Sequence, residues 1–318
     1  MKYVSILDIL ETQKAIEKLK NYFPQALAKK LNLTRVSAPL FVLTETGLND
    51  NLNGVEEAVT FEINGKQAEI VHSLAKWKRY ALKKYKFPLH SGIYTDMNAI
   101  RKDEILDVTH SYYVDQWDWE YIITKEERTD MFLETVVKKI YNALLDTENY
   151  ITSEFKKLPK TLPKDIYFLT SQELEDMYPS LDPEEREKEI CKIHKAVFVK
   201  QIGKTLKSGI SHGGRSADYD DWELNGDILV WYNELEIALE LSSMAIRVDK
   251  NSLKTQLAIR NEEHKLEFPY HKMILNEELP YTIGGGIGQS RLCMYLLKKI
   301  HIGEVQVSIW EDTDIELL

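Results

Sequence analysis

The stretch Thr282-Ile-Gly-Gly-Gly-Ile-Gly-Gln-Ser-Arg-Leu-Cys-Met-Tyr-Leu-Leu297 places four glycines between Gly284 and Gly288, followed by Arg291 and an apolar run. Glycine permits positive φ and close backbone approach, and the free N–H groups at a helix start favour anions. An arginine there can stack on a flat ring or pair with phosphate. The pattern predicts a glycine-rich turn that opens a helix. Taken alone, it suits an ordinary strand-to-helix corner as well as a nucleotide site.

The composition is that of a globular chain with a substantial core. The 318 residues are 43% hydrophobic and 29% charged, and no apolar run reaches the roughly 20 residues that span a bilayer. Cys191 and Cys293 supply neither a disulfide framework nor a zinc site. The N-terminal segment carries acids and no small-residue cleavage site, so we expect a cytoplasmic protein with no membrane partner. The net charge of −10 disfavours nucleic acid as a partner.

Hydrophobic periodicity predicts an alternation of helices and strands. Helices are expected over 8–31 (with a break or kink at Pro24), 72–82, 126–149, 171–175 (capped by Ser171), 183–194 and 252–275. Strands are expected over 33–43 (interrupted at Pro39), 110–120, 166–170, 195–202, 225–231, 238–249 and 304–310. A hairpin is expected over 57–72, because Asn64-Gly65 lies between alternating apolar runs. Residues 46–54 read as a loop.

Three segments carry more polar residues than packing requires. On the strand at 110–120, Gln116, Asp118 and Glu120 share one face, as expected for the floor of a polar ligand site. The loop 203–222 is long for a compact domain and ends in acids at 218, 220 and 221. Such clusters are often solvated turns, but they also hold Mg²⁺ beside phosphates. Glu240, Ser242 and Arg247 interrupt an apolar strand, and buried charge must be paired or bind something.

In this order, the segments resemble the catalytic core of class II aminoacyl-tRNA synthetases. The first motif of that class, which makes the dimer contact, is similar to Pro39 after an amphipathic helix. The second is similar to Arg101-Lys-Asp-Glu with the strand to Glu120, and the third is similar to Gly284–Arg291. The resemblance implies an α+β fold in which a mixed, mainly antiparallel sheet is flanked by helices. We expect residues 1–318 to form one catalytic domain without an anticodon-binding domain, because about thirty residues before the first motif are too few for a five-stranded barrel.

A closer resemblance is to the bacterial ammonia-dependent aspartate–ammonia ligases, the A-type asparagine synthetases. It rests on runs from Asp50 to Leu292: Asp50-Asn-Leu, His72-Ser-Leu-Ala-Lys-Trp-Lys-Arg, Tyr113-Val-Asp-Gln-Trp-Asp-Trp-Glu, Asp218-Tyr-Asp-Asp-Trp, Leu224-Asn-Gly-Asp-Ile-Leu-Val-Trp, Glu240-Leu-Ser-Ser-Met and the glycine stretch. A short connection between Trp222 and Asn225 departs from the pattern, since some members have a longer insertion there. The resemblance implies conversion of L-aspartate, ATP and ammonia to L-asparagine, AMP and pyrophosphate through β-aspartyl-AMP. It also implies a homodimer and Mg²⁺ accompanying ATP.

The resemblance assigns roles to the matching positions. The ATP-binding residues are Arg101 (at the α-phosphate), His110, Glu240, Gly286, Gly288 and Arg291 (stacked on adenine). The aspartate-binding residues are Ser73, Lys78, Gln116, Asp118, Ser242 and Arg247. The metal ligands are Asp227 and Glu240, with Asp220 as a possible third. Asp50 binds ammonium and takes its proton, and with Arg101, Gln116 and Asp118 it makes up the catalytic group.

Two other functions remain open at this point. One is charging tRNA with aspartate or asparagine, and the other is a non-catalytic synthetase-like module that senses an amino acid or binds a partner. The second is disfavoured, since a sensor needs no residues such as Arg101, Glu240 and Arg291. Neither cysteine lies in a nucleophile turn, so free ammonia is the expected nitrogen donor.

Overall fold

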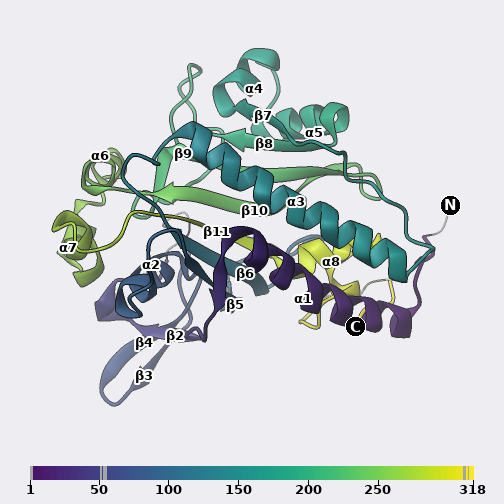
Figure 1. The fold of residues 1–318 in the computed structure, drawn as a ribbon, viewed down its shortest axis with the longest axis horizontal. Helices are drawn as coiled ribbons and strands as arrows, with labels where there is room; N and C mark the ends of the chain where they lie inside the picture. Colours follow the sequence, from purple (N-terminus) through teal and green to yellow (C-terminus); the bar gives the residue numbers. More distant parts are fainter. Residues whose placement is uncertain (1–2, 51, 53–55, 311–312, 314) are drawn as a thin grey trace.

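The computed structural model describes residues 3–50, 52, 56–310, 313 and 315–318. Within these residues, an eight-stranded sheet has the order β1-β5-β6-β11-β10-β9-β8-β7 (Figure 1). Its strands are β1 (Leu33–Arg35), β5 (Gly92–Ile100), β6 (Tyr113–Ile122), β11 (Thr282–Gly288), β10 (Ile237–Arg247), β9 (Asp220–Tyr232), β8 (Ala196–Lys200) and β7 (Tyr167–Thr170). The outermost pairs β1–β5 and β7–β8 are parallel and the inner pairs antiparallel. The expected α+β fold with a mainly antiparallel sheet is confirmed.

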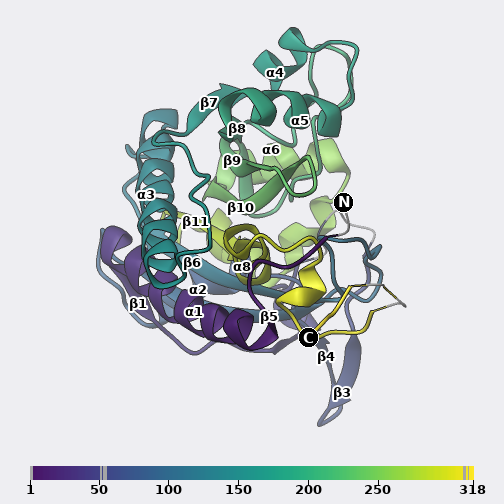
Figure 2. The same cartoon turned by 90° about the vertical axis from the view of Figure 1, so that its right-hand side faces the viewer.

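One face of the sheet is covered by three helices: α1 (Ile9–Leu31), α3 (Asp130–Glu154) and α8 (Gln289–Leu297). Figures 1 and 2 show α1 and α3 side by side along this face. Trp117 and Trp119 of β6 point into the core beneath them, and the Trp117 ring lies 4.8 Å from that of Phe23 in α1. Each large apolar side chain buried here stabilises the fold by roughly 1.5–3 kcal/mol. Trp117 and Trp119 of β6 are therefore used for packing.

The other face is covered less completely. The helices around it are α2 (Ala75–Lys84), α4 (Ser171–Met177), α5 (Pro183–His194), α6 (Lys250–Arg260) and α7 (Pro269–Leu275). Helix α2 contacts β6 and β11, while α5 contacts β9 and β10. A small sheet of β2 (Phe41–Leu43), β4 (Lys66–Ile70) and β3 (Thr60–Ile63) lies beyond α2 (Figure 1). Residues of α2 and of the central strands β6, β10 and β11 line a cavity on this face.

Several predicted elements are confirmed. The hairpin β3–β4 turns at Asn64 and Gly65, both with positive φ (50° and 75°), as a two-residue hairpin turn requires. Helix α5 has the predicted bounds. The predicted strand at 33–43 is divided around Pro39 into β1 and β2, which belong to different sheets. Of the predicted loop at 46–54, residues 51, 53 and 54 lie outside the described residues, and a 3-10 turn, η1, occupies Thr44–Thr46.

Other predictions are wrong in detail. Residues 304–310 form no strand, since the 3-10 turn η3 (Ile302–Glu304) is followed by irregular chain. The helix expected over 252–275 is divided into α6, η2 (Glu263–Glu267) and α7, because Asn261 ends α6 in the left-handed conformation. Helix α1 runs without a break through Pro24. Helix α4 is capped by Thr170, whose side chain accepts from the Glu173 N–H, rather than by Ser171.

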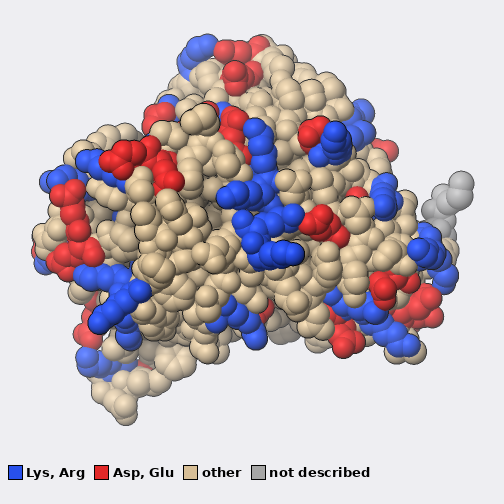
Figure 3. Space-filling view, in the orientation of Figure 1, with Lys and Arg blue, Asp and Glu red and all other residues tan. Residues whose placement is uncertain are grey.

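The surface carries both charge signs. On the face with α1 and α3, basic side chains gather near the middle, and acidic ones lie among and around them (Figure 3). In the described part of the chain, no helix has both the length and the apolar character needed to cross a bilayer.

Candidate active site

A cavity of about 390 Å³ opens on the face of the sheet opposite α1 and α3. The predicted site residues that line it come from six strands or helices and from the loops between them. They are Asp50, Ser73, Lys78, Arg101, His110, Gln116, Asp118, Asp220, Glu240, Arg247, Gly286, Gly288 and Arg291. Of the predicted set, only Ser242 and Asp227 do not line it. Sequence positions 50 to 291 thus converge on one cavity.

The glycine stretch forms part of its floor, in a conformation that the sequence did not predict. Gly284, Gly286 and Gly288 belong to β11, a central strand, and lie opposite Glu120, Asp118 and Gln116 of β6. None of the three has positive φ. A Cβ on Gly284 would lie 1.8 Å from Glu120 Oε2, and one on Gly286 would lie 2.3 Å from Gln116 Oε1. The glycines therefore provide room for the polar side chains of β6. The predicted turn over 284–288 is wrong, but the predicted helix after it is confirmed, since α8 begins at Gln289 with Gly288 as its N-cap.

Lys78 and Asp118, which both line the cavity, form a buried ion pair. Lys78 Nζ lies 2.9 Å from Asp118 Oδ2 and donates to the Gly285 carbonyl at 2.8 Å. Burial lowers the pKa of Lys78, against the opposing charge of Asp118. The second oxygen, Asp118 Oδ1, is buried and has no hydrogen-bond partner among the described residues. It is an acceptor available to a cationic ligand group.

Arg247 is fixed by acids on both sides. Its Nε and Nη2 donate to Glu120 at 3.0 and 2.8 Å, and its Nη1 donates to Asp220. Thr282 Oγ1 also donates to Glu120 at 2.6 Å. Burial works against the charged guanidinium, but Glu120 and Asp220 outweigh it and raise the pKa of Arg247. The guanidinium is held rigidly in the cavity wall.

Ser242 does not face the cavity. It is 2% exposed and donates to the Gly286 carbonyl at 2.9 Å, while its neighbour Ser243 lines the cavity. The register of β10 against β9 shifts between Glu240 and Ser242, leaving Leu241 as an extra residue. Such a bulge changes which residues point to each side. Alternation along the sequence alone could not show which of the two serines faces the cavity.

Two further arginines, Arg101 and Arg291, line the cavity. Arg291 Nη2 lies 2.8 Å from His110 Nε2, and its Nη1 donates to the Glu240 carbonyl at 3.3 Å. Arg101 follows β5, and its Nε is buried without a hydrogen-bond partner among the described residues. Its nearest acid is Glu104, at 3.9 Å. These guanidinium groups can contact an anion or a flat ring.

Asp50 reaches the cavity from the loop before β3. It is 3% exposed, and its Oδ2 accepts from the Tyr219 hydroxyl at 2.7 Å. Its Oδ1 accepts from the Leu52 N–H at 3.0 Å. Ser73 lies nearby at the start of α2, where its Oγ accepts from the Ala75 N–H at 3.4 Å. The carboxylate is thus held in place by a residue, Tyr219, to which sequence reasoning gave no role.

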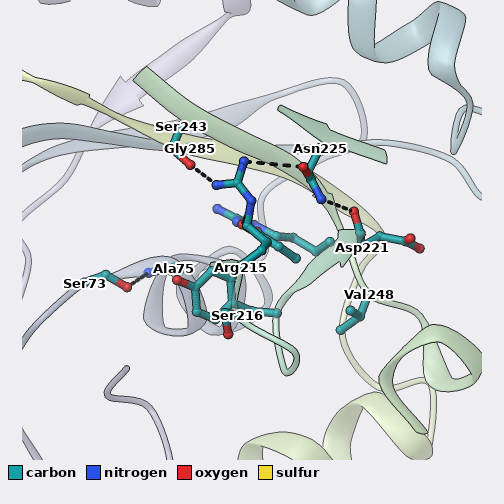
Figure 4. A network of polar contacts seen from close by, with 12 residues as sticks. Ser73, Ala75, Arg215, Ser216, Asp221, Asn225, Ser243, Val248 and Gly285 are labelled. Carbon is teal, nitrogen blue, oxygen red and sulfur yellow. Dashed lines mark hydrogen bonds and ion pairs between the residues drawn. The ribbon is translucent and has the colours of Figure 1, made fainter. Parts of the chain in front are cut away.

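The three acids predicted as metal ligands do not meet as a metal-binding group. In the described part of the chain, no three His, Cys, Asp or Glu side chains are placed to hold an ion. Instead, Arg215 is paired with two of these acids, with Nη2 at 2.7 Å from Asp227 Oδ1 and Nε at 3.8 Å from Asp220 Oδ2. Figure 4 shows the same guanidinium between Ser243 and Asn225. Burial raises the pKa of both Asp227 and Asp220 against the attraction of arginine. The third acid, Glu240, lines the cavity.

Sequence reasoning missed Arg215, Tyr219 and Ser243. All three touch predicted site residues or line the cavity. Two belong to the 203–222 loop, whose length did indicate a functional segment. Within that loop only the acids were singled out, because the partners of an arginine cannot be read from its neighbours in sequence.

Comparison with known proteins gives one consistent result. The model of the family described as aspartate-ammonia ligase matches residues 10–318. The aspartate–ammonia ligase of Ruminiclostridium cellulolyticum is 60% identical over 313 residues, covering 98% of this chain and 93% of that protein. That of Fusobacterium nucleatum is 60% identical over 311 residues, covering 98% and 95%.

Solved structures with the same fold are more distant in sequence. Asparaginyl-tRNA synthetase of Entamoeba histolytica superimposes with a TM-score of 0.69 at 11% identity, covering 94% of this chain and 67% of that one. The Pyrococcus horikoshii enzyme, complexed with asparaginyl-adenylate, gives 0.68 at 15% identity, covering 93% and 68%. The fold is that of the class II aminoacyl-tRNA synthetases.

Proposed function

The chain belongs to the aspartate–ammonia ligase family, and we propose which residues of its cavity act in each step of the ligase reaction. The enzyme uses ATP to join L-aspartate and ammonia into L-asparagine, releasing AMP and pyrophosphate. One observation carries the proposal: a single cavity combines a carboxylate oxygen of Asp118 and a guanidinium N–H of Arg101 that have no hydrogen-bond partner among the described residues. The first suits the ammonium of an amino acid, and the second suits phosphate.

The chemistry requires activation of aspartate first. A carboxylate is a poor electrophile, so its oxygen attacks the α-phosphate of ATP, forming β-aspartyl-AMP and expelling pyrophosphate. Negative charge grows on the α-phosphate during this step. Arg101 is placed to stabilise it, because its buried Nε has no other partner among the described residues. Arg291, held by His110 and Glu240, supports the adenine.

Aspartate lies over β6 and β11. Its ammonium group binds Asp118 Oδ1 and Gln116, both of which line the cavity. Lys78 has three N–H donors and uses two of them on Asp118 and Gly285, which leaves one for a carboxylate. With Arg247 it orients the substrate so that the side chain, rather than the α-carboxylate, meets the phosphate.

Ammonia enters as ammonium at neutral pH, as amines do, and must lose a proton before it attacks. We assign both tasks to Asp50, whose buried carboxylate lines the cavity and is held by Tyr219. Ammonia then displaces AMP from the acyl carbon. Asp50→Asn should reduce asparagine formation more than aspartate-dependent exchange of pyrophosphate into ATP. Equal loss of both activities would remove Asp50 from the second step.

The side-chain types of the three predicted metal ligands suit magnesium, although the described residues do not arrange them as a metal-binding group. Asp220, Asp227 and Glu240 supply the hard oxygen donors that Mg²⁺ prefers. We propose that these residues hold the ion that accompanies ATP. When bound, Mg²⁺ neutralises phosphate charge and assists departure of pyrophosphate. The carboxylates' own part is to hold the polyphosphate end of the nucleotide in position.

One assay tests the proposal against its rivals. The protein is incubated with ATP, Mg²⁺ and aspartate, with and without ammonium and with and without tRNA, while AMP and asparagine are measured. Asparagine and AMP in equal amounts, dependent on ammonium and indifferent to tRNA, are expected. AMP that appears only with tRNA would establish a charging enzyme. No AMP under any condition would support the sensor.

We further propose a cytoplasmic homodimer in which residues 1–318 act as one catalytic domain. Leu40 and Phe41, 51% and 42% exposed, follow Pro39, and Phe41 begins β2, an edge strand of the small sheet. Exposed apolar side chains next to a sheet edge suit an interface between copies. Light scattering should give twice the chain mass of 37.0 kDa, and Phe41→Glu should reduce it. A monomeric wild-type protein would contradict this assignment.

A further inference from the structure

We infer that Gln306 selects the base of the nucleotide, its amide oxygen accepting a hydrogen bond from the exocyclic amino group of adenine. The inference rests on the proposed function, in which adenine lies against Arg291, and it adds a specificity-determining residue to that site. Gln306 belongs to the irregular chain after η3, in the segment 304–310 that was predicted to be a strand and given no role.

Gln306 lies beside the part of the cavity assigned to the base. Its Nε2 donates to Ser290 Oγ at 2.9 Å, and Ser290 directly precedes Arg291. Two residues after Gln306, Ser308 Oγ accepts from Ser111 Oγ at 3.0 Å, so the same segment also contacts the loop before β6. Gln306, Ser111, Ser290 and Arg291 all line the cavity. A base held by Arg291 is therefore within reach of this segment.

The orientation of the Gln306 amide is fixed by its partners. Asp115 Oδ1 accepts from the Ser290 N–H at 3.1 Å and from its hydroxyl at 2.6 Å, while Lys20 Nζ lies 2.9 Å from Asp115 Oδ2. A carboxylate only accepts, so Gln306 turns its NH₂ group toward Asp115 Oδ1, at 3.3 Å. The Ser290 hydroxyl proton is used on Asp115, so the hydroxyl oxygen accepts the second N–H of Gln306. Both donors of the amide are occupied.

The acceptor of the same amide is left over. Gln306 is 5% exposed, and its Oε1 is buried without a hydrogen-bond partner among the described residues. Buried polar atoms are nearly always hydrogen-bonded, and an unsatisfied one costs free energy. Since Gln306 lines the cavity, a donor carried by a ligand can satisfy this oxygen.

The free acceptor distinguishes purine bases. Adenine presents an amino donor where guanine and hypoxanthine present a carbonyl acceptor. A glutamine with a freely turning amide could pair with either kind, but Gln306 has its N–H groups fixed and can only accept. A carbonyl placed against Oε1 would leave two acceptors unsatisfied, and sites built around a hydrogen bond reject such analogues strongly. The ligand class that fits is an aminopurine nucleotide.

The first test uses the wild-type protein and three nucleotides, each with Mg²⁺, in binding calorimetry. ATP carries the amino group, purine riboside triphosphate has hydrogen in its place, and ITP has a carbonyl. We expect ATP to bind at least ~10-fold more tightly than purine riboside triphosphate, because the analogue leaves Oε1 unsatisfied, and ITP to bind more weakly still. Equal affinity for ATP and either analogue would overturn the inference.

The second test removes the acceptor. Gln306→Met keeps a similar volume, and Asp115 retains its contacts with Ser290 and Lys20, so the variant should fold. Its preference for ATP over purine riboside triphosphate should fall to about twofold or less, because the amino group has lost its partner. A Gln306→Met protein that kept the wild-type preference would show that another group recognises the amino group.

Two variants separate recognition from packing. Gln289→Met is the control, since Gln289 is also 5% exposed, donates to Asp96 Oδ1 at 3.1 Å and lies outside the cavity lining. It should keep the wild-type preference even if it melts lower, and a preference lost here would attribute the effect to packing. Gln306→Glu retains an acceptor oxygen, and a carboxyl that shares a proton with Asp115 can still donate to it. This variant should keep the preference for ATP, and its loss would contradict the role of Oε1.

The outcome for Gln306 is independent of the outcome for the reaction. The affinities are measured without aspartate or ammonia, whereas the proposed function depends on asparagine formation by the wild type. A protein that makes asparagine but shows no preference set by Gln306 would refute this inference alone.

Discussion

Replacing Lys78 by Met tests the buried ion pair on which the proposed aspartate site depends. Lys78 and Asp118 are 1% and 3% exposed in their side chains and lie 2.9 Å apart. Methionine keeps most of the volume but leaves Asp118 as a buried charge without its partner and the Gly285 carbonyl without its donor. Breaking a buried pair in this way costs about 3–5 kcal/mol. At roughly 2 °C per kcal/mol for a chain of this length, the melting temperature should fall by about 6–10 °C.

The matched control lies on the same helix. Lys83 pairs with Glu278 at 2.9 Å, but both side chains are more than a third exposed. Exposed pairs contribute little, so Lys83→Met should melt close to the wild type. The double variant Lys78→Met/Asp118→Asn should recover part of the loss, because it removes the uncompensated carboxylate.

The measurement is thermal unfolding by circular dichroism without ligands, together with aspartate binding by calorimetry. Aspartate should bind Lys78→Met weakly or not at all at temperatures where the variant is folded. If Lys78→Met melted no lower than Lys83→Met, the pair would not be the buried, mutually dependent contact described here. Normal aspartate affinity in a folded Lys78→Met protein would refute the binding role.

Three further changes have defined outcomes. Gly284→Ala should prevent stable folding or lower the melting temperature sharply, because the new Cβ would lie 1.8 Å from Glu120 Oε2. A variant as stable as the wild type would show that β6 can move away from the added methyl group. Although burial opposes ionisation, Lys76 holds the pKa of Asp218 well below its usual range, with His271 assisting. The stability that this carboxylate provides is therefore present above about pH 4 and is lost as the pH falls through its folded pKa. Asp218→Asn should flatten the acid limb of a curve of unfolding free energy against pH. An unchanged acid limb would show that Asp218 does not contribute to this pH dependence. Arg101→Ala should slow aspartate-dependent pyrophosphate exchange at least ~10²-fold, and a rate near normal would place it outside the α-phosphate site.

Local sequence determined the elements that depend on neighbouring residues. Asn64-Gly65 specified the β3–β4 turn because both residues tolerate positive φ. The alternation along β6 separated Trp117 and Trp119, which pack in the core, from Gln116 and Asp118, which line the cavity. Period-2 alternation persists because this strand has no register shift against β5 or β11. The same local patterns supported the family resemblance and hence the reaction.

Register and long-range contact were decided by the tertiary structure. The bulge at Leu241 turned Ser242 away and brought Ser243 to the cavity, a change that depends on pairing with β9. The glycine stretch became a strand because β6 and β10 pair with it on both sides, which outweighs the weak strand propensity of glycine. No local signal distinguished this strand from a turn.

The charge arrangement also belongs to the tertiary structure. The sequence determined that Asp220, Asp227 and Glu240 are acids suited to a metal, but not that Arg215 lies among them. Tyr219 and Asp50 are far apart in the chain and meet through a 2.7 Å hydrogen bond. Ion pairs and hydrogen bonds depend on distances of a few ångströms between segments that only folding brings together. The sequence alone therefore determined which kinds of side chain the site contains, and the fold decided which of them are paired before any substrate binds.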